Sequence, residues 1–219
     1  MANGTAQSSI TMRKDAWWAA PLVTATILTV FGLYSTWRAF SNADFLVEPY
    51  LSPFYSPYLL ASWWPLSPAL LILWAPLGFR ATCYYYRKAY YRSFFMAPPG
   101  CAVRPLAKEG SYTGETKFPF ILQNIHRYFF YAAGVILLFL WIDALHAFKF
   151  EDGFGVGVGT IVLLINAFLL SMYSLSCHSF RHLVGGKLDV LSKCPTRFQI
   201  RGKVSEWNEN HMFWARVSL

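Results

Sequence analysis

The stretch GFGVGVGTIVLLINAFLLSMYSLSCHSF, residues 153–180, runs for 28 residues without a charged side chain. A helix that crosses the hydrocarbon core of a bilayer needs about 20 mainly apolar residues. No water reaches the backbone there, so the segment must bond its own N–H and C=O groups, as a helix does. This stretch therefore predicts a membrane-spanning helix and sets the class of the whole chain.

Three further stretches have the same character. Residues 16–37 and 49–79 carry no charge, and residues 118–148 are apolar apart from His126, Arg127, Asp143 and His146. Only 14% of the 219 residues are charged, whereas a soluble domain has about a quarter. We therefore predict an all-α fold, an integral membrane helical bundle with four visible spans. The spans are expected over residues 16–38, 66–86, 119–147 and 156–183.

The basic residues predict how the bundle is oriented. If the N-terminus lies in the cytoplasm, every Lys and Arg except Arg38 and Lys149 falls on the inner side or at the inner boundary. Such an excess is typical of cytoplasmic segments. The net charge of +8 is then explained by topology, by anionic lipid and by an acidic partner subunit. Nucleic acid is not an expected partner, because the basic residues flank the spans.

This topology divides the chain into three segments. Residues 1–15 are expected to form a cytoplasmic N-terminal segment, residues 16–186 the transmembrane bundle, and residues 187–219 a cytoplasmic tail. Apolar residues in the tail follow helical spacing, which predicts an amphipathic C-terminal helix. Because this helix stops abruptly at the last residue, we expect that a fifth span is missing after it. The alternative is a short surface helix.

Histidine and cysteine gather on the inner side under this topology, and only His146 lies outside. His178 and His182 are four residues apart on the last turns of the fourth span, so both imidazoles share one helical face and can bind one metal. Ionisable side chains at membrane depth are functional candidates, so we expect a metal centre. The alternative is that the histidines bond lipid head groups or cap helix ends. The remaining inner-side members are Cys83, Cys101, His126, Cys177, Cys194 and His211.

The residue types are compatible with three centres. Two imidazoles from different helices, His126 with His178 or His182, suit a b-type haem. Two Cys with two His suit a Rieske-type [2Fe–2S] cluster, in which the histidines bind one iron and the cysteines the other. A structural zinc is also compatible with these ligands. The spacing alone does not separate the three.

Three longer segments resemble the membrane-anchor subunit of complex II, succinate:quinone oxidoreductase, in its actinobacterial-type class. They are FRATCYYYRKAYYRSFFMAPPGCAV (79–103), YTGETKFPFILQNIHRYFFY (112–131) and LSCHSFRHLVGGKLDVLSKCP (175–195). The segment WRAFSNADFLVEPYLSPFYSP (37–57) agrees as well, so the resemblance covers nearly the whole chain. This family normally continues into a fifth span after the tail helix.

The resemblance implies a membrane-embedded Rieske-type [2Fe–2S] cluster and no haem. Carried over to this chain, the expected ligands are Cys83, Cys101, His178 and His182. The second group of candidates is Cys177, His126 and His211. The residues that offer donors to a quinone at the required depth are Arg80, Tyr84, His126, Arg127 and Tyr128.

The implied function is that of a non-flavin subunit of succinate dehydrogenase or fumarate reductase in the bacterial cytoplasmic membrane. A flavoprotein subunit oxidises succinate, an iron–sulfur subunit passes the electrons on, and this anchor delivers them to quinone. Two alternatives stay open. One is a bis-His haem b cytochrome that anchors another quinone-linked dehydrogenase, and the other is a cofactor-free membrane scaffold or transporter.

Overall fold

The computed structural model describes residues 15–94, 120–186, 190 and 193–219. Within these ranges the chain is mainly helical, and the prediction of an all-α membrane bundle is confirmed. The α-helices are α1 (Ala19–Ser41), α2 (Trp74–Thr82), α3 (Tyr84–Phe94), α4 (His126–His146), α5 (Val158–Leu175), α6 (His178–Gly185), α7 (Pro195–Glu209) and α8 (His211–Val217). The short elements are the hairpins β1–β2 (Leu46–Val47, Tyr50–Leu51) and β3–β4 (Lys149–Phe150, Gly153–Phe154), and the 3-10 turns η1 (Pro53–Tyr55), η2 (Pro68–Leu71) and η3 (Phe120–Ile125).

Among the described residues, three helices are long and apolar enough to cross a membrane: α1, α4 and α5. They correspond to the first, third and fourth expected spans. Large apolar side chains on them face outward, including Leu33, Leu138 and Val162, each more than half exposed. In a soluble protein an outward apolar face of this size would be an interaction surface, whereas in a membrane protein lipid covers it.

The second expected span, residues 66–86, differs from the expectation because it is not one continuous helix. Pro68 begins the short turn η2, α2 starts at Trp74, and the backbone of Cys83 is extended (φ −66°, ψ 130°) before α3 begins. The fourth expected span is broken as well. It ends at Leu175, Cys177 is extended (φ −68°, ψ 143°), and the chain resumes as α6.

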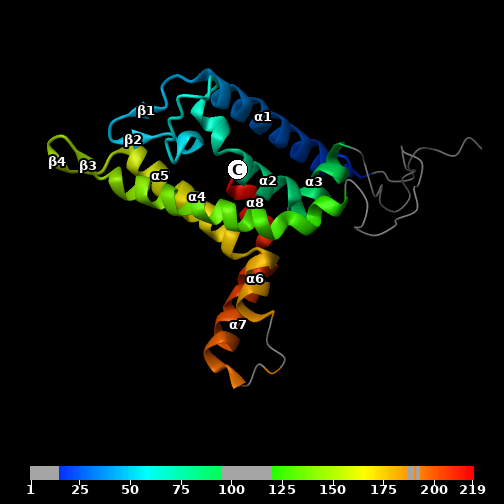
Figure 1. Ribbon diagram of the computed structural model, residues 1–219. Helices are drawn as coiled ribbons and strands as arrows, with labels where there is room; N and C mark the ends of the chain where they lie inside the picture. Colours follow the sequence, from blue (N-terminus) through cyan, green and yellow to red (C-terminus); the bar gives the residue numbers. More distant parts are fainter. Residues whose placement is uncertain (1–14, 95–119, 187–189, 191–192) are drawn as a thin grey trace, which may run out of the picture.

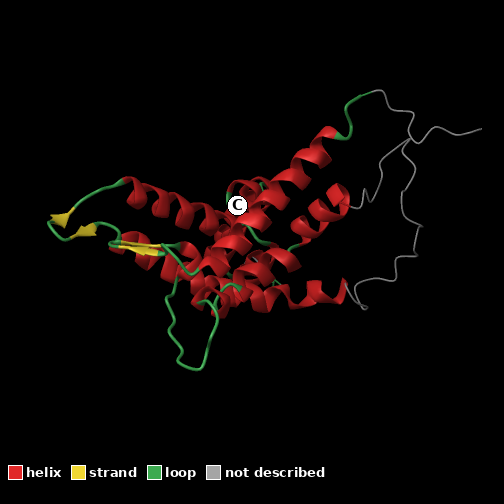
Figure 2. Cartoon of the chain, turned by 90° about the horizontal axis from the view of Figure 1, so that it is seen from above, coloured by secondary structure: helices red, strands yellow, loops and turns green. Residues whose placement is uncertain are grey.

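Helix α4 packs against both α2 and α5, and α1 packs against α3 (Figure 1). Helices α6 and α7 pack against each other and project away from α1, while the two hairpins lie at one end of the long helices (Figures 1 and 2). Helix α8 returns to the bundle and contacts α5 and α3. The last part of the expected cytoplasmic tail is therefore packed among the helices and is not a surface appendage.

Among the described residues, one cluster of buried side chains contains both helix breaks. It contains side chains from α2, α3, α4, α5 and α8 and includes both extended cysteines. Its members are Phe79, Cys83, Tyr86, Ala133, Tyr173, Cys177 and Ala215. The two breaks thus meet in the interior of the bundle, at the point where the C-terminal helix enters it.

Candidate functional site

The site is built on two cysteines that each separate two helices. Cys83 follows α2 and precedes α3, Cys177 follows α5 and precedes α6, and both are 2% exposed. The Cys177 thiol accepts a hydrogen bond from the N–H of Ser179 at 3.4 Å. Cys83 holds the corresponding position before α3, where its carbonyl accepts from the N–H of Arg87 at 3.0 Å. The thiolate is the form of cysteine that binds metal. The position before a helix stabilises it, while the burial of both thiols opposes it.

His126, the first residue of α4, faces Cys177. Its Nε2 atom lies 3.2 Å from the Cys177 Sγ, and its Nδ1 atom lies 2.8 Å from the Thr82 Oγ1. The imidazole stacks on the ring of Phe79 with centroids 4.8 Å apart. Helix α2 can bring Thr82 and Phe79 this close because Gly78 packs against the ring of Phe129, where a side chain would collide.

His211, the first residue of α8, faces Cys83 in the same manner. Its Nε2 atom lies 3.5 Å from the Cys83 Sγ, and its Nδ1 atom lies 2.8 Å from the Ser176 Oγ. The imidazole stacks on Tyr173 with centroids 5.1 Å apart. Burial, and to a smaller extent the charge of His178, lowers the pKa of His211 to about 4. The ring is therefore neutral at physiological pH, as a metal ligand must be.

Arg80 holds the C-terminal helix in place. Its guanidinium donates to the Ser218 carbonyl at 2.5 Å and to the Tyr86 hydroxyl, which itself donates to the Ala215 carbonyl. The guanidinium also lies over the ring of Tyr173, 4.9 Å from its centroid. One cation therefore joins α2, α3 and α5 to the last turn of α8, and so fixes where His211 sits.

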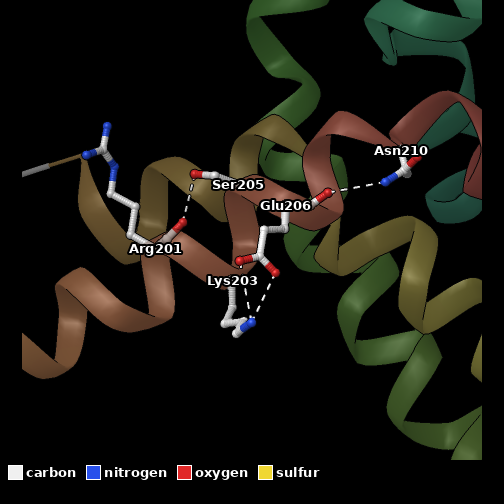
Figure 3. Close-up of polar contacts among 5 residues, drawn as sticks. All are labelled: Arg201, Lys203, Ser205, Glu206 and Asn210. Atoms are coloured by element: carbon white, nitrogen blue, oxygen red, sulfur yellow. Dashed lines mark hydrogen bonds and ion pairs between the residues drawn. The ribbon is translucent and has the colours of Figure 1, made fainter.

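The C-terminal end of α7 determines the direction in which α8 enters the bundle. Ser205 and the Asn210 side chain bond the carbonyls of Arg201 and Glu206 within the helix, and Lys203 pairs with Glu206 at 3.1 Å (Figure 3). Asn210 then leaves helical geometry (φ −97°, ψ 14°) directly before His211. From the same turn, the Asn208 side chain donates to the Ser176 carbonyl at 2.7 Å.

The structure separates the predicted ligands into two groups. It brings Cys83, Cys177, His126 and His211 together. His178 and His182 instead contact each other, with 2.9 Å between their Nε2 atoms, on an exposed face of α6. Among the described residues neither of these two bonds any of the four. Cys101 lies outside the described residues, and the ligand assignment itself stays a prediction.

The four donors meet as two Cys–His pairs. No group of three or more His, Cys, Asp or Glu side chains within the described ranges surrounds a single metal position. A tetrahedral zinc takes four such ligands at one ion, so it does not match this arrangement. In a [2Fe–2S] cluster each iron takes only two protein ligands, and two Cys with two His form the Rieske-type set. The donor types, two Cys and two His, are therefore compatible with a two-iron cluster.

In the part of the chain that the structure describes, a groove and a cavity lie outside this core. The first is a groove of about 700 Å³ along α7, lined by Leu175, Phe180, Gln199, Ile200, Gly202, Lys203, Val204, Glu206 and Trp207. The second is a cavity of about 110 Å³ where α1, α3 and the C-terminus meet, lined by Val23, Thr24, Ile27, Leu28, Tyr85, Tyr86, Ala89, Arg216 and Leu219. The second touches the site through Tyr86.

The predicted quinone residues are dispersed. Arg80 lies over the ring of Tyr173, on which His211 stacks, and His126 is one of the four donors. Tyr84, Arg127 and Tyr128 are exposed on the outside of the helices. The sequence-based prediction did not include Phe79, Thr82, Tyr173 and Ser176, which contact the two imidazoles. A signal was available, because a hydroxyl residue directly precedes each central cysteine.

Two comparisons with known proteins both point to a subunit of succinate dehydrogenase. Residues 19–219 match the model of the family described as actinobacterial succinate dehydrogenase subunit SdhC. A chain of the Mycobacterium smegmatis Sdh1 complex in the apo form is similar in structure, with a TM-score of 0.85 and 46% sequence identity. The match covers 95% of the present chain and 84% of that chain. No curated protein matches.

Proposed function

This chain belongs to the actinobacterial family of succinate dehydrogenase subunit SdhC, and we propose that it passes electrons from the soluble part of that complex to quinone through a [2Fe–2S] cluster. Membership makes it a membrane-anchor subunit of succinate dehydrogenase, with apolar helices that cross the membrane several times. The proposed cluster ligands are Cys83, His126, Cys177 and His211.

The proposal rests on one observation: two Cys–His pairs, each with a buried thiol, lie where two helices are broken and the C-terminal helix enters. Irregular backbone at membrane depth is tolerated where it is buried in protein or lines a site. A bound cluster would supply one-electron transfer. The chain would contribute thiols at helix N-termini, neutral imidazoles, and an aromatic shell of Phe79 and Tyr173 that excludes water and lowers the dielectric.

We place the quinone ring in the 110 Å³ cavity beside Tyr86. Its α1 wall is mainly apolar, with Val23, Ile27 and Leu28 beside Thr24. The Tyr85 hydroxyl and the Arg216 guanidinium, bonded to each other at 2.8 Å, also line the cavity. Both groups can donate to a quinone carbonyl. Pockets for small ligands combine apolar walls with a few such polar groups. Arg80 then connects the cavity to the cluster ligands through Tyr86.

The partners follow from the family. Other succinate dehydrogenase subunits accompany the similar chain in the Mycobacterium complex. We propose that the flavoprotein and iron–sulfur subunits dock on the cytoplasmic face, with the N-terminus of this chain on that side and anionic lipid around the basic flanks.

The geometry does not favour the haem alternative. That alternative pairs His126 with His178 or His182. His126 instead directs Nε2 at the Cys177 thiol and stacks on Phe79. His178 and His182 contact each other on an exposed face of α6.

The test measures iron, acid-labile sulfide and the EPR spectrum of the purified complex, and repeats them for single replacements. The proposed cluster contributes two irons beyond those of the iron–sulfur subunit, and an EPR signal of low average g. We expect Cys83→Ser, Cys177→Ser, His126→Ala and His211→Ala each to lose these two irons and this signal. The double replacement His178→Ala/His182→Ala is the matched control and should keep both. Signal loss in the double variant alone would return the ligand role to the α6 pair, and a reduced haem α-band would defeat the cluster.

A further inference from the structure

Two segments of the chain share a spacing and a position in the fold. They are Phe79-Arg-Ala-Thr82-Cys83 at the end of α2 and Tyr173-Ser-Leu-Ser176-Cys177 at the end of α5. Each has an aromatic residue four positions before the cysteine and a hydroxyl residue directly before it. In each, the cysteine leaves helical geometry and begins the next helix.

In each segment the aromatic residue and the hydroxyl residue contact one histidine, and the thiol that faces this histidine belongs to the other segment. Phe79 stacks on His126, and Thr82 bonds the same ring. The thiol that faces His126, however, is Cys177, which comes from the other segment. Tyr173 and Ser176 likewise hold His211, while the facing thiol is Cys83. Each imidazole is thus oriented by one segment and presented to the cysteine of the other.

The hydrogen bonds of Thr82 determine where the proton of His126 sits. A hydroxyl carries one hydrogen, and Thr82 Oγ1 gives it to the Gly78 carbonyl at 2.7 Å, an atom that can only accept. The contact between Oγ1 and Nδ1 of His126 at 2.8 Å must then use a hydrogen on Nδ1. A neutral imidazole has one N–H, so Nε2 carries a free lone pair toward Cys177.

Ser176 and His211 lead to the same assignment. Ser176 Oγ gives its hydrogen to the Tyr173 carbonyl at 3.1 Å and accepts from Nδ1 of His211 at 2.8 Å. Nε2 of His211 is therefore the unprotonated nitrogen and faces Cys83. Two unrelated parts of the chain reach the same tautomer by the same device, a hydroxyl whose hydrogen is committed to a carbonyl of its own helix.

We infer that Thr82 and Ser176 are positioning residues that hold His126 and His211 as Nδ1–H tautomers, with Nε2 free to bind the metal centre. This inference rests on the proposed cluster. A partner on the second ring nitrogen fixes the orientation and tautomer of a metal-bound histidine, and its loss costs about 10–100-fold in metal affinity. Without the hydroxyl, the buried Nδ1–H loses its acceptor and the ring can turn over.

The experiment compares Thr82→Val and Ser176→Ala with Thr82→Ser and Ser171→Ala in the assembled complex. Thr82→Val keeps the shape and removes the hydroxyl, and Thr82→Ser restores it. Ser171 also bonds a carbonyl of α5, but its partner is Trp141 and not a histidine, so it is the matched control. We expect iron release to a chelator to be at least tenfold faster in Thr82→Val and Ser176→Ala, with a shifted midpoint potential in EPR titration. Thr82→Ser and Ser171→Ala should behave as wild type.

Wild-type rates and potentials in both assembled hydroxyl-free variants would overturn the inference. If these variants do not assemble, pulsed EPR of the wild-type complex grown with histidine labelled with ¹⁵N at Nε2 decides. Strong coupling of the labelled nitrogen is expected, and strong coupling from Nδ1 instead would refute the assignment. Absence of the iron and of the EPR signal in the wild type would refute the proposed cluster itself, together with the role built on it, so the two failures are distinguishable.

Discussion

Gly78 of α2 lies against the ring of Phe129 of α4 so closely that a Cβ atom at residue 78 would overlap the ring. The contact sits one helical turn before Thr82 and Cys83, and three residues after His126. It therefore sets the separation of the two helices at the height of the site, because small residues let membrane helices approach closely.

Replacement of Gly78 by Ala should push α2 away from α4. Overpacking of this kind costs about 1–3 kcal/mol, and here it would also separate Thr82 from His126. We expect a lower thermal midpoint of the complex and faster iron release. Gly134→Ala on α4 is the control, because nothing lies within 4 Å of a Cβ atom there. Equal midpoints for the two variants would contradict the role given to Gly78.

Arg80 provides a second prediction, because it ties the last turn of α8 to three other helices. Arg80→Met keeps much of the side-chain volume but leaves the Ser218 carbonyl without its donor, at a cost of about 1–3 kcal/mol. We expect α8 to loosen, so that its backbone amides exchange hydrogen faster and less iron is retained. Lys88→Met on the exposed face of α3 removes one positive charge elsewhere and should change neither measurement. Unchanged amide exchange of α8 in Arg80→Met would mean that α8 is held by its apolar contacts.

The sequence was sufficient for the parts of the fold that depend on local composition. Long, mainly apolar stretches predicted α1, α4 and α5, because span length and low charge are properties of one segment. The breaks at Cys83 and Cys177 were not predicted. Neither position carries the Pro or Gly that usually marks a break, and the backbone there is determined by what packs around it.

In the candidate site, too, contacts within one helix could be predicted, whereas contacts between residues far apart in the sequence could not. The i, i+4 spacing of His178 and His182 is a strong local signal, but these two residues face each other on an exposed surface. His211 lies 128 residues from Cys83 in the sequence and was placed in a cytoplasmic tail, so no spacing rule could bring the two together. Only the return of α8 into the bundle does so. The hydroxyl–cysteine repeat was readable in the sequence, but its meaning depends on that return.

The cavity beside Tyr86 gives a prediction about quinone. Ala89 lines this cavity of about 110 Å³, and none of the four donors is among its lining residues. Ala89→Leu should fill much of it, so that the KM for quinone rises about tenfold, the loss expected for about 1.4 kcal/mol of binding free energy. Succinate oxidation with an artificial dye and the EPR signal should stay unchanged. Ala81→Leu, on an exposed position of α2, is the matched control. An unaltered KM in Ala89→Leu would place the quinone elsewhere.

The orientation of the chain in the membrane can be tested by cysteine labelling, because the distribution of basic residues predicts a single topology. The turn of the β3–β4 hairpin contains Asp152, which is exposed and lies on the outer side if the N-terminus is cytoplasmic. Arg92 near the end of α3 then lies on the inner side. A membrane-impermeant maleimide should label Asp152→Cys in intact cells and Arg92→Cys only in inverted vesicles. Both variants are made in a chain that carries Cys101→Ser and Cys194→Ser, because Cys194 is half-buried whereas Cys83 and Cys177 are buried. Labelling of Arg92→Cys in intact cells would reverse the topology, and the proposed cluster ligands would then lie far from subunits docked on the cytoplasmic face.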